Sequence, residues 1–384
     1  MNLKKVFAIG LAIRVCILVI SWDISNYDLQ SYHMVGEMTL SGQSIYPEIA
    51  LFRYPYVPFF LYLQAAAVLF RPFDIGILKL VIIAFDVGII ILLGEWFKKK
   101  SAALFYALSP IPILIAAFHG QFDSVPLFFL LLAILLLKRK KVGWGTFIYS
   151  AAIALKTWPL FFIIPFVRLV LSSRANEVRR GIFSKISRLI ARNDNVCTVL
   201  FFVFLSMLIP LITVYFYSYF FKTPVEQILH TIRTYQPVFG VYGIGLLLKS
   251  VFGRSDLYFV GMVEKIFLLS LFVFAYFQRK KTIEENILGI LLYLFVFTPV
   301  FGTQWLIWVV PFLLILRPRG VFVLLILTST FLILNYLSWI FYVSDFVLLG
   351  SGVMIWLAFI YTFIRYTVPI SVKSKPPSSA KVAK

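Results

Sequence analysis

The stretch WDISNYDLQSYHMVGEMTLSGQSIYPEIALFRYPYVP, residues 22–58, is a polar and aromatic segment that lies between two strongly apolar segments. Besides several tyrosines, it contains four acids, one histidine and one arginine: Asp23, Asp28, Glu37, Glu48, His33 and Arg53. Loops held by a rigid scaffold are where binding and catalytic residues concentrate. We therefore expect residues 22–58 to form a long outer loop that supplies half of an active site.

The nature of the scaffold follows from the composition. Hydrophobic residues make up 61% of the 384 residues and charged residues only 14%, and the mean hydropathy is +0.94. A chain this apolar cannot hide its surface in one soluble core. The sequence therefore predicts an all-α, polytopic, multi-pass protein of the cell membrane.

The formal net charge of +20 has a direct explanation in such a protein. Lys and Arg gather in the cytoplasmic loops of membrane proteins and set their orientation. The charge therefore indicates orientation and contact with membrane lipids, and no nucleic-acid partner is expected. Cys16 and Cys197 lie within or at the edge of apolar segments, so no disulfide framework is expected either.

Two basic runs, residues 98–100 and 138–141, flank a pair of apolar segments that are joined by the sequence HGQFD, residues 119–123. If both runs are cytoplasmic, HGQFD lies on the outer face together with the first loop. Extended along the chain, this scheme predicts about twelve transmembrane helices in one helical domain over residues 1–370, with both termini cytoplasmic. The basic residues 371–384 are expected to be a disordered cytoplasmic tail.

Two segments are expected not to cross the membrane. An odd number of crossings must separate the outer loop from the lysines at 98–100, so one of the two intervening apolar segments stays on one side. Residues 54–70 are the weaker spanner, because Pro55 and Pro58 stand in the first turns, and we expect a re-entrant or interfacial helix. The basic stretch 172–194 is expected on the cytoplasmic side, as an interfacial helix on anionic lipid or as a solvated connector.

One charged residue falls near the middle of the first predicted span, residues 6–22. This residue is Arg14, and an unpaired charge there costs about 2.5–3.5 kcal/mol on insertion scales. Arg14 should therefore face inward toward an acid, and Asp86 is a candidate partner.

Polar sets recur where short apolar segments meet on the predicted outer face: residues 22–58, 119–123, 156–158 and 302–305. Ionisable groups at membrane depth are costly and usually line a cavity, so these sets predict a pocket that opens outward. A carboxylate near a cation there suits displacement at a phosphorylated carbon. The carboxylate acts as general base, and the cation stabilises the leaving phosphate.

The order of these motifs resembles the GT-C superfamily of membrane glycosyltransferases. It looks closest to the polyprenyl-phosphate-mannose-dependent mannosyltransferases of the GPI-anchor pathway and their prokaryotic relatives. The resemblance covers residues 1–170 well and rests on residues 28–32 (DLQSY), 42–46 (GQSIY), 53–58 (RYPYVP), HGQFD and Lys156. It implies a GT-C-like fold and an enzyme that takes a sugar from a polyprenyl phosphate on the outer or lumenal face.

In that family an acidic residue of the first outer loop is the catalytic base, and the matching position here is Asp28. Some relatives carry an Asp-x-Asp pair, whereas the first position of the pair is Asn26 in this chain. A metal-binding role of the pair is therefore in doubt, and Asp23 is the alternative acid. A divalent metal stays an open question, since His33 and His119 are too few to predict a metal site.

The other candidate residues would bind the donor. Lys156 either binds the donor phosphate as a point charge or snorkels to the interface, and Arg53, followed by Tyr54, is a second phosphate candidate. Asp123 is either a second carboxylate of the site or the cap of the helix that starts at Ser124. Further donor-binding candidates are residues of the two outer hinges: His119, Gln121, Gln304 and Trp305, with Trp158 and Trp308 as residues that stack on a sugar or hold the interface.

These features predict an inverting glycosyltransferase. Its donor substrate is a polyprenyl-phosphate-linked hexose, expected to be mannose, and its acceptor is a lipid-linked or cell-surface glycan; no other cofactor is implied. The alternative is a membrane transporter or flippase of a lipid-linked sugar, whose outer charges bind substrate during alternating access. Against the alternative, the polar residues gather at one face and the chain has no recognisable inverted repeat.

Overall fold

The structure, a computed structural model, describes residues 2–24, 26–46, 48–178, 185–235 and 237–368. The first part of the chain forms helices of unequal length: α1 (Leu3–Ile20), α2 (Tyr27–Leu40), α3 (Glu48–Arg53), α4 (Leu61–Val68), α5 (Asp74–Ile91), the π-helix η1 (Leu92–Trp96), α6 (Lys100–Leu108), α7 (Pro110–Ile113) and the π-helix η2 (Leu114–His119). The middle part continues with longer helices: α8 (Ser124–Lys138), α9 (Val142–Leu155), the 3-10 helix η3 (Trp158–Phe162), α10 (Ile163–Val178) and α11 (Lys185–Phe221).

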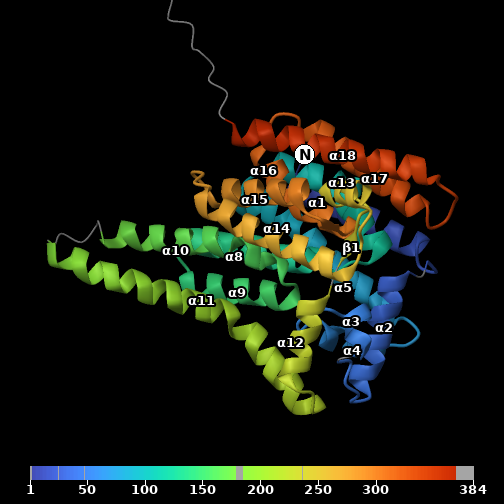
Figure 1. Ribbon diagram of the computed structural model, residues 1–384, viewed down its shortest axis with the longest axis horizontal. Helices are drawn as coiled ribbons and strands as arrows, with labels where there is room; N and C mark the ends of the chain where they lie inside the picture. Colours follow the sequence, from blue (N-terminus) through green and yellow to red (C-terminus); the bar gives the residue numbers. More distant parts are fainter. Residues whose placement is uncertain (1, 25, 47, 179–184, 236, 369–384) are drawn as a thin grey trace, which may run out of the picture.

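The last part adds a pair of short strands to the helices. Its elements are α12 (Val225–Thr234), β1 (Val238–Phe239), α13 (Gly243–Phe252), α14 (Leu257–Phe277), α15 (Ile283–Phe297), β2 (Val300–Phe301), the 3-10 helix η4 (Thr303–Trp305), α16 (Leu306–Leu316), α17 (Val321–Leu337) and α18 (Asp345–Thr367). In Figure 1, α17 and α18 lie along one edge of the molecule, and α2, α3, α4 and α12 form a smaller group at the opposite edge.

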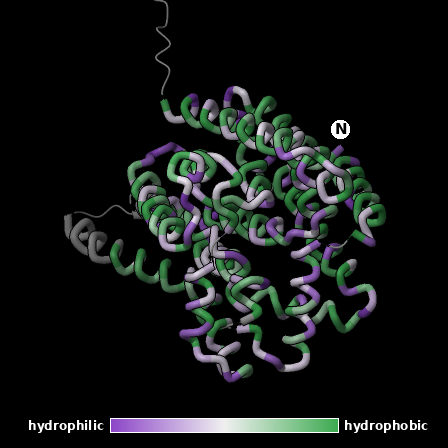
Figure 2. Tube along the Cα trace, turned by 45° about the vertical axis from the view of Figure 1, so that its right-hand side comes forward, coloured by the Kyte–Doolittle hydropathy of each residue, from purple (hydrophilic) through white to green (hydrophobic). Residues whose placement is uncertain are grey.

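Several helices can cross a membrane by length and composition. Four of the helices in the described residues qualify: Asp74–Trp96 (α5 continued by η1), Val196–Phe221 in α11, α14 and α18. The pair Lys100–Leu108 and Pro110–His119, bent by 52°, makes a fifth if it forms one broken span. Figure 2 shows that hydrophobic residues dominate most of these helices. The chain is thus a mostly helical protein with apolar helices of membrane-spanning length.

The other expected crossings fall on shorter apolar helices of 10–17 residues, namely Ser124–Lys138, Val142–Leu155, Trp158–Ser172, Gly243–Phe252, Thr303–Leu316 and Val321–Leu337. A helix that spans the hydrocarbon core alone needs about 20 residues. Proline sets the break between α6 and α7. The residue before a proline avoids helical geometry, and Ser109, just before Pro110, is extended and separates α6 from α7.

The predicted loop 22–58 is wrong in one respect, because much of it is helical. Asn26 caps α2, since its Oδ1 accepts a hydrogen bond from Leu29 N at 3.0 Å. This gives an acceptor to one of the backbone N–H donors that a helix start leaves unpaired. The next segment, 54–70, contains only the eight-residue helix α4, which is about 12 Å long and too short to cross a membrane. The re-entrant or interfacial placement of residues 54–70 stays a prediction.

The two basic segments are described only in part. The stretch 172–194 was expected to be one helix or a connector, whereas α10 continues to Val178 and α11 begins at Lys185. Residues 179–184 between them, and the predicted tail 371–384, lie outside the described residues.

The predicted partner of Arg14 is confirmed. Arg14 Nε lies 2.5 Å from Asp86 Oδ2, and both side chains are fully buried. Arg14 Nη1 also donates to the carbonyls of Gly10 and Ala107 at 3.0 and 3.1 Å, and Tyr106 donates its hydroxyl to Asp86 Oδ1 at 2.7 Å. This network joins α1, α5 and α6 in the interior.

The expectation of an all-α protein overlooks one small sheet. Strand β1 pairs antiparallel with β2, so that Val238 faces Phe301 and Phe239 faces Val300. The two strands come from identical tetrapeptides, PVFG at 237–240 and at 299–302. The pair joins the segment after α12 to the segment after α15.

Candidate functional site

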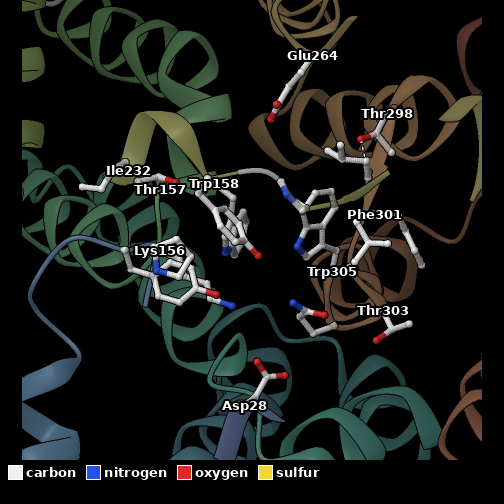
Figure 3. Close-up of a pocket in the computed structure, with 18 of the residues that line it drawn as sticks. Asp28, Lys156, Thr157, Trp158, Ile232, Glu264, Thr298, Phe301, Thr303 and Trp305 are labelled. Carbon is white, nitrogen blue, oxygen red and sulfur yellow. Dashed lines mark hydrogen bonds between the residues drawn. The ribbon is translucent and has the colours of Figure 1, made fainter. Parts of the chain in front are cut away.

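A cavity of about 1550 Å³ lies between α2, α3, η3, α12, α14 and the start of α16. Eight of the residues expected from the sequence to form the site line it: Asp28, Arg53, His119, Lys156, Trp158, Gln304, Trp305 and Trp308. In Figure 3, Asp28 and Glu264 lie on opposite sides of this cavity, and Trp158 and Trp305 lie between them. Residues far apart in the sequence therefore face one common space.

Asp28 stands in the first turn of α2. The partial positive charge of a helix N-terminus favours a carboxylate there. Its cap residue, Asn26, uses both ends of the side-chain amide: Oδ1 accepts from Leu29 N, and Nδ2 donates to the carbonyl of His119 at 3.0 Å. Asn26 thus links the start of α2 to the HGQFD hinge. An ionised aspartate at this position could not make the second hydrogen bond, because its side chain has no donor.

The hinge presents His119 directly to Asp28. His119 Nε2 lies 2.8 Å from Asp28 Oδ2, and its Nδ1 lies 2.9 Å from the hydroxyl of Tyr336. Gly120 ends η2 with a φ of +79°, and a Cβ at this position would lie 2.8 Å from Leu29 Cδ2. The positive φ is the reason that this hinge favours glycine.

Two opposing influences set the pKa of Asp28. Burial is the largest and raises the pKa, but the hydrogen bond and charge of His119, a hydrogen bond from Gln121 and the charge of Lys156 together lower it below its usual range. The carboxyl is therefore ionised at neutral pH. With 36% of its side chain exposed, the carboxylate of Asp28 is accessible from the cavity.

Lys156 lies at the break between α9 and η3, in extended backbone just before Thr157-Trp158-Pro159. Its Nζ donates to Asp123 Oδ2 at 2.6 Å, and the other carboxylate oxygen of Asp123 accepts from Trp308 Nε1 at 2.7 Å. Lys156 Nζ also lies 4.4 Å from the ring centroid of Phe122. The lysine points into the protein next to the cavity and does not snorkel to an interface.

Asp123 is fully buried and does not line the cavity. Although it precedes α8, its side chain makes no capping hydrogen bond to that helix. Of the two expected roles, the helix cap is therefore wrong, and Asp123 instead compensates the charge of Lys156 behind the cavity wall.

Three tryptophans form one wall of the cavity. The rings of Trp158 and Trp308 stack with centroids 4.4 Å apart, and those of Trp305 and Trp308 with centroids 5.2 Å apart. The hydrogen bond from Trp308 to Asp123 fixes the middle ring. Flat aromatic faces of this kind suit the apolar faces of a sugar ring.

The remaining predicted residues have different placements. Arg53 lines the cavity, stacks over Tyr27 with its Cζ 4.1 Å from the ring centroid and donates to Ser31 Oγ at 3.2 Å. Tyr54 is fully buried and does not line the cavity, because its hydroxyl donates to the carbonyl of Val57 and accepts from Leu61 N. Tyr54 therefore holds the turn before α4.

Gln121 and Asp23 also lie outside the cavity lining. Gln121 is buried and accepts a hydrogen bond from the hydroxyl of Tyr32 at 3.0 Å, so it supports Asp28 from behind. Asp23 is exposed in a turn after α1. Of the two candidate acids, only Asp28 faces the cavity.

Several cavity residues were not predicted from the sequence. Tyr235, Glu264 and Lys265 line the cavity on the wall that α12 and α14 form. Tyr336 contacts the cavity residue His119 but does not itself line the cavity. The repeated PVFG tetrapeptide is the one sequence signal that could have found part of this wall, since Pro237, Val238, Val300, Phe301 and Gly302 line the cavity.

The residues around Asp28 do not fit a divalent metal. The described part of the chain contains no group of three or more His, Cys, Asp or Glu side chains that could hold a metal ion. Beside Asp28, the oxygen of Asn26 is already used by Leu29 N, and His119 uses both ring nitrogens. In comparisons with known proteins, no family model, curated protein or solved structure matches this chain.

Proposed function

We propose that the protein is an inverting glycosyltransferase that transfers a hexose from a polyprenyl-phosphate donor to a lipid-linked or cell-surface acceptor. The observation that carries the proposal is that an ionised carboxylate, Asp28, and a cation, Lys156, line the same cavity. Transfer to a hydroxyl needs both groups. A base removes the proton of the acceptor hydroxyl, and a positive charge stabilises the phosphate that leaves.

In the proposed reaction, the acceptor oxygen attacks the anomeric carbon from the face opposite the phosphate. The new glycosidic bond forms as the bond to the phosphate oxygen breaks, and the proton of the hydroxyl passes to Asp28. The low pKa of Asp28 keeps it ready to accept this proton at neutral pH. The configuration at the anomeric carbon is therefore inverted.

Lys156 is the proposed contact of the leaving phosphate. An ammonium group has three hydrogen-bond donors, and Asp123 takes one of them. The remaining donors are available to a phosphate oxygen in the cavity. Arg53, on the α2–α3 side of the same cavity, is the second cation that fits this role.

The size and lining of the cavity suit two sugar-bearing substrates. Its volume of about 1550 Å³ exceeds the roughly 300–1,000 Å³ of sites for single small ligands. The stacked Trp305 offers a ring face for a sugar, and Gln304 beside it offers an amide for hydroxyl groups. The apolar residues of α14 along another wall suit a polyprenyl chain.

The decisive assay measures sugar transfer by the purified protein in detergent with a panel of polyprenyl-phosphate hexoses, mannose first. Detergent solution has no second compartment, so turnover there requires chemistry and separates an enzyme from a flippase. Transfer with inversion supports the proposal. Absence of transfer from every donor, together with flux of a lipid-linked sugar in proteoliposomes, would favour the transporter instead.

The proposal includes a topology of about twelve crossings, with the cavity outside and both termini cytoplasmic. We test it with single cysteines at two exposed positions, Tyr342 and Lys140, after replacing the exposed Cys16 and Cys197 by serine. An impermeant thiol reagent added to intact cells should label Tyr342→Cys and spare Lys140→Cys. The opposite pattern would invert the orientation.

A further inference from the structure

We propose that His119 is a positioning residue that orients the carboxylate of Asp28 for proton transfer, and that Tyr336 fixes His119 in turn. The inference rests on the proposed function, because it describes how the base of that reaction is held. It also replaces the expectation that His119 binds the donor. Contacts at both ring nitrogens and at the backbone carbonyl hold His119 in place.

The first contact faces the base. His119 Nε2 lies 2.8 Å from Asp28 Oδ2, and an ionised carboxylate can only accept hydrogen bonds. The hydrogen therefore sits on Nε2, and the imidazole donates to Asp28. A carboxylate offers about four lone-pair positions, so those not used by His119 and Gln121 are left for the proton of a substrate hydroxyl.

The second contact faces away from the base. His119 Nδ1 lies 2.9 Å from the hydroxyl of Tyr336, which also hydrogen bonds with Thr303 at the start of η4. A hydroxyl can donate to a bare ring nitrogen or accept from a protonated one, so Tyr336 satisfies Nδ1 in either state. Both ring nitrogens are thus occupied, and only 5% of the side chain is exposed.

The third contact holds the backbone. The carbonyl of His119 accepts from Asn26 Nδ2 at 3.0 Å, and Asn26 caps the helix that begins next to Asp28. The ring also lies edge-on to Trp339, with centroids 4.9 Å apart. Asp28 and His119 are therefore held together through both side chain and backbone, which is the support that a precisely oriented catalytic group requires.

Other titratable groups face Asp28 from the surrounding elements. They are Lys156, Tyr32, Tyr56, Tyr235 and Tyr336, while Asp123 lies behind Lys156. Burial raises the pKa of Asp28, and His119 is the main influence that lowers it. Loss of His119 should therefore raise the pKa of Asp28, so that the base becomes protonated at a higher pH than in the parent protein.

The test compares His119→Leu, His119→Gln and Tyr336→Phe with the parent, and uses His230→Gln and Tyr342→Phe as matched controls at exposed positions outside the cavity. The first readout is kcat and KM for sugar transfer as a function of pH. The second is labelling of Asp28 by a water-soluble carbodiimide, which reacts with protonated carboxyls, followed by mass spectrometry across the same pH range.

In His119→Leu we expect kcat to fall on the order of 10²-fold, since a misplaced catalytic group costs about that much, while KM for the donor changes little. The acidic limb of the rate profile and the labelling profile of Asp28 should both move to higher pH. His119→Gln, whose amide can still donate, should recover part of the loss. Tyr336→Phe should shift both profiles in the same direction by less.

The outcomes separate the two proposals. Unchanged kcat and unchanged profiles in an active His119→Leu overturn the role of His119 and leave the glycosyltransferase proposal standing. If the parent transfers no sugar, the proposed function fails, and the labelling profiles alone decide whether His119 controls Asp28. If His119→Leu does not fold, Tyr336→Phe decides: profiles that coincide with the parent overturn the inference.

Discussion

The interior pair Arg14–Asp86 and the cavity pair Lys156–Asp123 consist of the same kinds of charge in different surroundings. In the first pair both side chains are fully buried, and the arginine is held by Asp86 and by the carbonyls of Gly10 and Ala107. In the second pair the aspartate is fully engaged, whereas the lysine also lines a cavity. A buried ion pair is thus structural when both partners are enclosed, and becomes a candidate site when one partner faces open space.

The largest expected effect on transfer is at Asp28. This carboxylate lines the cavity and is the proposed base. Asp28→Asn keeps the size of the side chain but cannot take a proton, so transfer should fall by about 10²- to 10⁴-fold with little change in stability. Asp28→Glu should lose about 10²-fold, since it misplaces the carboxylate. Rates of transfer and thermal unfolding in detergent check both.

Asp23→Asn is the matched control, because Asp23 is exposed and outside the cavity lining. It should retain nearly full activity. An inactive Asp23→Asn beside an active Asp28→Asn would show that the wrong acid has been assigned. Full transfer by both variants would show that neither Asp23 nor Asp28 is the base.

The interior pair should respond in stability and not in chemistry. Arg14→Met leaves Asp86 buried without its cation, which costs about 3–5 kcal/mol, and we expect a large fall in the temperature of thermal unfolding. The double change Arg14→Met with Asp86→Asn removes both charges and should recover most of the loss. If the folded double variant loses transfer activity by 10²-fold, the interior pair is not merely structural.

The cavity pair should separate stability from activity. Lys156→Met alone leaves the charge of Asp123 buried and uncompensated. This variant should therefore lose both stability and transfer activity. Lys156→Met with Asp123→Asn removes both charges and keeps an oxygen for Trp308 Nε1. We expect this double variant to unfold at nearly the parent temperature while transfer stays on the order of 10²-fold down, the cost of losing one electrostatic contact to developing charge. If the double variant transfers sugar at the parent rate, the phosphate contact should be assigned to Arg53 instead of Lys156.

The pH dependence of transfer sharpens the contrast further. The pKa of Asp28 lies below its usual range in the folded protein, and only the ionised form can accept a proton. Lowering the pH should therefore leave kcat/KM unchanged through the usual aspartate range and reduce it only below that range. A profile that falls already near neutral pH would assign the base to another group.

The smallest effect is expected at Asn26, which supports the site through hydrogen bonds and carries no charge. Asn26→Asp keeps the cap oxygen of α2 but loses the donor to the carbonyl of His119, and Asp caps helices about as well as Asn. The loss of one hydrogen bond should cost about 1 kcal/mol of the free energy of unfolding, measured by denaturation in detergent. Asn26→Ala, which loses the cap as well, should cost more.

The sequence predicted the scaffold and the charged anchors of the site, because both follow from local rules. Apolar composition indicated a helical membrane protein, and the cost of an unpaired charge led from Arg14 to Asp86, which the structure confirms. The breaks at HGQFD and at Lys156 also follow from glycine and proline in the chain. These features need no knowledge of how distant segments pack.

The contacts between distant segments could not be predicted in this way. His119 was expected to bind the donor, yet its two nitrogens meet Asp28 and Tyr336, which lie 91 and 217 residues away in the chain. Tyr54 was expected beside Arg53 in the site, yet its hydroxyl holds a turn. No periodicity specifies such partners, because packing decides which side of a short segment faces the cavity.

The contacts of α16 and α17 also set an order of events during synthesis. Asp28, His119 and Asp123 leave the ribosome early, whereas their partners Trp308 and Tyr336 follow 185 and 217 residues after Asp123 and His119. Until those late helices pack against the rest of the chain, the early polar groups must keep water or transient partners. The arrangement of the candidate site therefore cannot exist in a nascent chain that ends before α17, and a ribosome stalled at that point would hold an incomplete site.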